Sequence, residues 1–166
     1  MNRNKVEKRE RQEFVERPEF SVERMLIRNQ GQGSSVESRR KRFRFENLEV
    51  WQAARSLNRK VYRLTREFPS EEQFGLTSQI RRASVSVSSN IAEGCGRNSD
   101  KDFAHFLEQS YGSLMEVASQ FFLAQDEQYV SLEDAESVLE DIDSLAGKTV
   151  ALNRSLDVGS SKVRLK

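Results

Sequence analysis

FAHFLEQSYGSLMEVASQFFLA, residues 103–124, is the stretch of sequence that decides the fold. Its core-type positions recur in alternating steps of four and three residues, which is the spacing of one face of an α-helix. These positions are Phe103, Leu107, Ser110, Leu114, Val117, Phe121 and Ala124. The stretch therefore predicts a helix of about six turns with one face buried in a core.

Three further helices are predicted around this stretch. Apolar stripes at helical spacing occupy residues 50–68, 76–91 and 138–156. Asn47 is the expected N-cap of the first helix, and Pro69, which lacks a backbone donor, marks its end. Each of the other helices follows a capping-box pattern, a Ser with an acid or amide three residues later. The pairs are Ser70 and Gln73, Ser99 and Asp102, and Ser131 and Asp134.

Four amphipathic helices with short connections pack most simply as an antiparallel up-down bundle that crosses at about 20°. The expected fold is therefore all-α, with the four-helix bundle at residues 45–157. Residues 1–44 lack apolar periodicity and contain 13 Lys/Arg against 7 Asp/Glu. We expect them to form a basic arm that is disordered or transiently helical. Residues 158–166 form a short basic tail.

The composition argues against several classes of protein. Of 166 residues, 27 are Lys or Arg and 26 are Asp or Glu, and no apolar run approaches the roughly 20 residues that cross a bilayer. The N-terminus lacks the apolar segment of a secretory signal. Cys95 and His105 are the only cysteine and histidine, which argues against an internal disulfide or a zinc site. We expect a cytoplasmic protein without membrane contact, metal or cofactor.

A stripe of arginines follows the first predicted helix, and its members fall within about 80° of one face. They are Arg55, Arg59, Arg63 and Arg66. Only Arg63 has an acid four residues downstream, so most of this charge is not neutralised within the helix. The stripe either contacts RNA phosphates or is a solvated face paired with the acidic segment 125–156, which has 8 acids against 2 bases. The sequence leaves both interpretations open.

RRKRFRF, residues 39–45, interleaves aromatic residues with a basic run. Such a composition can bind backbone phosphates and stack on unpaired bases. The side chains expected to contact nucleic acid here are Arg39, Arg40, Lys41, Arg42 and Arg44. The alternative is an unstructured tether in which Phe43 and Phe45 only pack on the start of the bundle.

The helix at 103–124 carries a second apolar stripe, offset by one position from the first. Its members are Tyr111, Met115, Ala118 and Phe122. The apolar face is therefore wider than one packing seam requires. A subunit interface and a deeply buried helix of a monomer explain this width equally well.

Asn90, Glu93, Arg97 and Glu116 place carboxylates and an amide near one predicted turn. They resemble an acid/base cluster, but no nucleophile with a paired base accompanies them, and no phosphate-binding loop motif occurs. We interpret Asn90 and Glu93 as partners of backbone donors and arginines around the Gly94 turn. We predict no catalytic residue, and the chain is not expected to be an enzyme.

Several segments carry a family resemblance. They are FGLTSQIRRA at 74–83, Ser86, NIAEG at 90–94, Gly96-Arg97, and Gly112-Ser113 with Glu116. Together they resemble the four-helix bundle family encoded in intervening sequences of 23S ribosomal RNA genes, which includes the accessory variability proteins of diversity-generating retroelements. The resemblance covers roughly residues 45–155. It implies a small helical bundle, and from the retroelement members a pentameric ring that engages a reverse transcriptase and RNA.

Two functional hypotheses follow from the residues and the resemblance. The first is a non-enzymatic homo-oligomer that binds RNA or a ribonucleoprotein through the arm and the arginine stripe. The second is a protein–protein scaffold whose oligomer interface and acidic last helix contact other proteins, with the arm as a tether. A weak dependence of binding on salt would favour the second.

Overall fold

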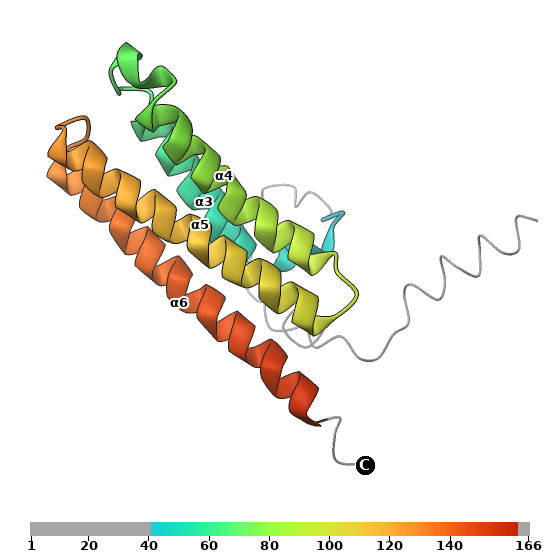
Figure 1. Ribbon diagram of the computed structural model, residues 1–166. Helices are drawn as coiled ribbons and strands as arrows, with labels where there is room; N and C mark the ends of the chain where they lie inside the picture. The colour runs from blue at the N-terminus through green and yellow to red at the C-terminus, as the bar shows by residue number, and fades with distance from the viewer. Residues whose placement is uncertain (1–40, 163–166) are drawn as a thin grey trace, which may run out of the picture.

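The computed structural model describes residues 41–162, and the surroundings of side chains through residue 156. The four main helices are α3 (Glu49–Leu64), α4 (Leu76–Cys95), α5 (Asp100–Asp126) and α6 (Leu132–Lys162). Consecutive helices run in alternating directions, and α6 packs against both α5 and α3 (Figure 1). The predicted all-α antiparallel four-helix bundle is confirmed. The expected arm lies outside the described residues except for its last four positions.

The core follows the stripe that the sequence predicts for α5. All seven positions from Phe103 to Ala124 are at most 1% exposed. Ser110, the polar member, donates its hydroxyl to the backbone oxygen of Val87 at 3.0 Å. This bond satisfies the hydroxyl inside the core and joins α5 to α4.

The contact between α4 and α5 depends on small residues. A methyl group added to Gly94 would lie 2.6 Å from Phe103 Cδ2 and 2.7 Å from Phe106 Cβ. Further along, the Ser113 hydroxyl donates to Ser86 Oγ at 2.9 Å. The two helices therefore approach closely where the sequence supplies glycine and serine in place of larger side chains.

The ends of α3 differ from the prediction. A short 3-10 helix, η1 (Arg44–Asn47), precedes it, so Leu48 and not Asn47 occupies the N-cap, without a side-chain cap. α3 ends at Leu64. Phe68 still reaches the core from the following turn, at 8% exposed, with its ring 5.8 Å from that of Tyr129.

The capping pattern at Ser70 was also a wrong prediction. Ser70–Gln73 forms the 3-10 helix η2, and the Ser70 hydroxyl bonds to the neighbouring Glu71. α4 begins six residues after Ser70, at Leu76, whose N–H donates to the Glu72 carboxylate at 2.7 Å. The caps at Ser99 and Ser131 are confirmed, because they accept the backbone N–H of Asp102 and Asp134 at 3.0 and 3.1 Å. α6 continues to Lys162, past the expected end of the bundle at 157.

Candidate nucleic-acid interface

The four arginines of the predicted stripe are all exposed: Arg55, Arg59, Arg63 and Arg66. Within residues 41–156 they form no ion pair with the acidic helix α6. The cation of α3 that faces α6 is Lys60, which donates to the backbone and hydroxyl oxygens of Ser137 at 3.0 and 2.9 Å and pairs with Asp141. The arginine stripe is therefore left facing solvent.

Aromatic rings connect the arginine stripe to residues 41–48, where the described chain leads into α3. We call residues 41–48 the chain entry. Phe43 stacks on Phe45 with centroids 5.4 Å apart, and Phe45 lies 4.8 Å from Trp51. The Arg55 guanidinium lies 5.7 Å from the Trp51 ring. Phe43 is 60% exposed, whereas Phe45 packs against the core. The tether interpretation therefore holds for the packing of Phe45, but Phe43 keeps an open ring face.

At the far end of α3 a second aromatic–arginine contact joins α3 to α4. Arg81 of α4 places its guanidinium 5.1 Å from the Tyr62 ring. It also donates to the Thr65 hydroxyl at 2.8 Å and to the Thr65 backbone oxygen at 3.1 Å. Tyr62 lies three residues after Arg59 and four before Arg66. The side chains of Arg59 and Arg66 are therefore neighbours of Tyr62 on the surface of α3 and of the turn that follows it.

We call this combined surface the basic–aromatic track. It starts at the chain entry, follows the outer side of α3, and ends at the N-terminal part of α4. Its members are Phe43, Phe45, Trp51, Arg55, Arg59, Tyr62, Arg63, Arg66 and Arg81.

The basic run before η1 is only partly described. Arg39 and Arg40 lie outside the described residues. Lys41, Arg42 and Arg44 are exposed at the chain entry, where the backbone N–H groups of Arg42 and Phe43 donate to the Glu46 carboxylate at 3.0 Å each. The run therefore enters the bundle next to the aromatic end of the track.

The second stripe of α5 is largely exposed. Tyr111 and Met115 are each 38% exposed, and Phe122 is 53% exposed. Ala118 lies half-buried against the core. Leu123, which the sequence analysis missed, is 52% exposed beside Phe122. We call Tyr111, Met115, Phe122 and Leu123 the α5 patch.

Gly112 lies on the exposed side of α5, within the span of the α5 patch. A methyl group added there would meet no atom within 4 Å. Glycine in a helix is about 0.5–1 kcal/mol less stable than alanine. The packing of the described residues therefore gives no reason for this glycine.

The polar cluster predicted around the α4–α5 turn is only partly assembled. Arg97 pairs with Glu93 and lies 4.5 Å from the Phe106 ring, while Asn90 donates to Ser86 Oγ at 3.2 Å. Glu116 lies ten residues beyond Phe106, or about 15 Å along α5. The acid/base arrangement does not form, and Asn90 bonds within α4 to the hydroxyl of Ser86 instead of to the Gly94 turn.

Cys95 lies at the same end of the bundle and is 1% exposed. Burial raises the pKa of its thiol, and the charge of Arg44 lowers it in part. A thiol that stays protonated is a poor nucleophile and a poor metal ligand. Cys95 is therefore a packing residue.

The described residues offer neither a metal cluster nor a membrane span. No group of three or more His, Cys, Asp or Glu side chains among them is placed to hold a metal ion. None of their helices is long and apolar enough to cross a membrane.

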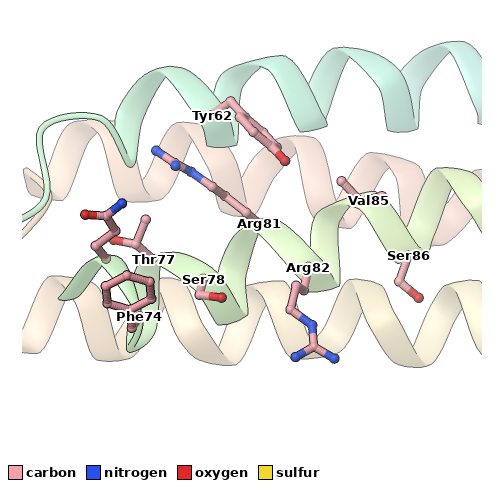
Figure 2. A pocket seen from close by; sticks show the side chains of 9 residues that line it. Tyr62, Phe74, Thr77, Ser78, Arg81, Arg82, Val85 and Ser86 are labelled. Carbon is pink, nitrogen blue, oxygen red and sulfur yellow. The ribbon is translucent and has the colours of Figure 1, made fainter.

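The sequence did not predict the groove at the end of the basic–aromatic track. Its volume is about 580 Å³, and it is lined by Tyr62, Gln73, Phe74, Thr77, Ser78, Arg81, Arg82, Val85 and Ser86. Figure 2 shows Arg81 extending from α4 towards α3, where Tyr62 lies, while Arg82 points away from α3. The Arg81-Arg82 pair was visible in the sequence, but its position beside Tyr62 depends on which flank of α3 meets α4. We call this hollow the Phe74 groove.

These features define a small helical-bundle protein with a basic outer side and an exposed apolar patch. Within that class, residues 46–151 match the family described as 23S rRNA-intervening sequence protein, and the chain belongs to this family. The fold is similar to the crystal structure of a protein with unknown function from the S23 ribosomal protein family from Bacteroides thetaiotaomicron. The TM-score is 0.59 and the identity 21%, over 63% of this chain and 97% of that one. No functionally curated protein matches the chain.

Proposed function

We propose that this protein is a non-enzymatic helical bundle that binds RNA, free or in a ribonucleoprotein, through the basic–aromatic track. The observation that carries the proposal is that Arg55, Arg59 and Arg63 of α3 are exposed and form no ion pair with described acids. Arg55 also lies 5.7 Å from the Trp51 ring. Membership of the 23S rRNA-intervening sequence family fits this function without specifying it.

The chemistry of the track suits RNA. Arginine offers a planar fork of donors that matches phosphate oxygens, and its guanidinium also stacks on bases. Phe43 and Tyr62, with 60% and 38% of their surface exposed, add ring faces at the two ends of the track. Unpaired RNA bases stack on such rings. Phosphate contacts and stacking would act together along one side of the bundle.

The experiment is a titration of a structured RNA across a salt series. In the full-length chain, Arg55→Gln with Arg59→Gln is compared with Lys101→Gln plus Arg154→Gln, which removes the same charge from other exposed positions. The track variant should reduce the slope of log K against log salt by roughly 0.7 to 0.9 for each phosphate that is no longer neutralised. The control should keep the wild-type slope.

A second full-length variant separates the arm from the bundle. Replacing Arg39, Arg40, Lys41 and Arg42 with Gln tests the arm alone. If wild type binds no RNA at low salt, the RNA-binding proposal fails. If binding disappears only in the arm variant, the track is not the binding surface.

The α5 patch supports a second function, assembly into a homo-oligomer or scaffold. Exposed apolar clusters of this kind mark interaction surfaces, and Gly112 beside them leaves room for a second backbone to approach. An oligomer would also repeat the track on every subunit, which strengthens binding to one RNA through multivalency. A pentamer, as the family resemblance implies, is one form of this proposal.

A reverse transcriptase with its RNA is the specific partner implied by the accessory variability proteins. This part of the proposal depends on the setting of the gene. A neighbouring gene for a reverse transcriptase with a variable repeat would support it. A location inside a ribosomal RNA gene would support the intervening-sequence role instead.

A further inference from the structure

We propose that the Phe74 groove is a site for unpaired RNA nucleotides, in which a base stacks on Phe74 and phosphates bind Arg81 and Arg82. The inference rests on the proposed RNA-binding function and adds a specific site and the kind of RNA that it takes. Neither the family match nor the solved relative assigns a ligand to this groove.

The size and lining of the groove fit this ligand. Its volume of about 580 Å³ lies within the range of about 300–1,000 Å³ that is usual for small-ligand sites. Phe74 is 89% exposed, so its ring faces are open to a stacking partner. The Arg82 side chain forms no ion pair with the described residues. An apolar ring and an unpaired cation thus share one groove.

Arg81 is fixed in place before any ligand binds. Its Nε and Nη2 donate to Thr65 at 2.8 and 3.1 Å, and its guanidinium lies 5.1 Å from the Tyr62 ring. A guanidinium has five N–H donors, so three remain for an incoming phosphate. A side chain that is already ordered loses little conformational entropy on binding.

One buried hydroxyl beside the groove has no hydrogen-bond partner among the described residues. Thr77 lines the groove and is only 4% exposed, yet its Oγ1 has no hydrogen-bond partner within the described residues. A buried hydroxyl without a partner usually costs about as much as a lost hydrogen bond. The oxygen itself is enclosed, so a ligand in the open groove reaches it only if the Thr77 side chain turns outward.

Charge and position favour RNA as the occupant. Tyr62 is followed by Arg63 and Arg66, so the groove lies at the end of the arginine stripe. A strand bound along the track would reach the groove with its phosphates already held by arginine. Stacking on an exposed ring needs an unstacked base, so the groove should prefer single strands to a continuous duplex.

The test uses full-length protein and two labelled probes, a short oligo-uridine RNA and a blunt RNA duplex of the same length. Phe74→Ala should weaken binding of the single strand by at least about five-fold, the lower end of base-stacking effects, and should leave duplex binding nearly unchanged. Arg82→Gln should reduce the salt slope for the single strand by about 0.7. The control, Arg154→Gln, removes an exposed arginine from α6 and should have no effect.

Photo-crosslinking locates the contact directly. Oligo-uridine that contains 4-thiouridine should crosslink to the peptides that hold Phe74 or Tyr62. If the wild type binds RNA but the Phe74 and Arg82 variants match the control, or crosslinks map only elsewhere, the groove is not the site and the RNA function stands. If the wild type binds the structured RNA but neither probe, the groove fails and the RNA function stands. If it binds none of the three RNAs, both fail.

Discussion

Gly94 and Gly147 both lie in helices, but only Gly94 lies in a tight packing contact. Replacing each with alanine therefore distinguishes the effect of packing on stability from the effect of helix propensity. A methyl group on Gly94 would lie 2.6 Å from the Phe103 ring, whereas one on the exposed Gly147 would meet nothing within 4 Å. We expect Gly94→Ala to lower the free energy of unfolding by about 1–3 kcal/mol through overpacking. Gly147→Ala should raise it by about 0.5–1 kcal/mol through helix propensity. Urea unfolding measures both, and equal effects would contradict the close α4–α5 contact.

The reactivity of the Cys95 thiol measures how often the bundle opens at the end where residues 41–48 lead into α3. Because it is 1% exposed and burial raises its pKa above the usual 9.0, the thiol should react with a disulfide reagent at pH 8 only as fast as the protein opens. Urea should accelerate the reaction as the protein unfolds. Rapid reaction in the native state would show that Cys95 is not shielded.

The Cys95 thiol should make the folded protein less stable as the pH rises above 9.0. Its folded pKa is raised, so the folded state holds the proton more tightly than the unfolded state. This contribution to stability is complete below pH 9.0 and is lost as the pH rises through the folded pKa. Relative to Cys95→Ala, the wild type should therefore lose stability more steeply above pH 9, as measured by urea unfolding at several pH values.

At the scale of helices, Ser99 caps α5 with its side chain, whereas Ser70 caps no helix. Ser99 accepts the N–H of Asp102 and starts α5, whereas Ser70 bonds only to Glu71 ahead of α4. Ser99→Ala should therefore cost about 0.5–2 kcal/mol of stability, and Ser70→Ala should stay within about 0.5 kcal/mol of wild type. Thermal melts of the two variants, compared side by side, test this difference. Equal losses would contradict the assignment of the α4 start.

Sequence patterns predicted the elements better than their ends. The spacing from Val50 to Phe68 predicts one helix, but Phe68 keeps its buried position from a turn after Leu64. An apolar period records which side chains are buried, and a turn that folds back can bury one as well as a helix can. The capping pattern at Ser70 fails for a similar local reason, since Glu72 supplies the acceptor at the start of α4.

At the scale of the whole molecule, the sequence predicted which residues are exposed and basic. It did not predict which side chains from different helices come together when the helices pack. The positions of Arg55, Arg59 and Arg63 on α3 follow from helical spacing alone, whereas Arg66 lies in the turn after Leu64. The Phe74 groove does not follow from spacing, because Tyr62 and Arg81 lie on different helices and meet only through the α3–α4 contact. The ion pair between Lys60 and Asp141 likewise could not be predicted from the sequence, because it depends on which side of α3 packs against α6.

The α5 patch lets assembly be tested on the intact protein. If the α5 patch joins subunits, Met115→Glu with Phe122→Glu should convert the oligomer to a 19.2 kDa monomer, because each buried carboxylate would lose its hydration without gaining a partner. Multi-angle light scattering at several concentrations measures the mass. Leu132→Glu is the matched control, because Leu132 is 59% exposed at the start of α6, outside the α5 patch.

The control should assemble as the wild type does, and circular dichroism should show the same helix content in all three proteins. Gly112→Ala refines the test, since a methyl group there touches nothing within the described chain and would disturb only a partner that approaches closely. It should therefore weaken assembly while the helix itself gains stability. A wild type that is monomeric at every concentration would remove the oligomer from the proposed function. Any RNA affinity would then come from single bundles, without the gain from multivalency.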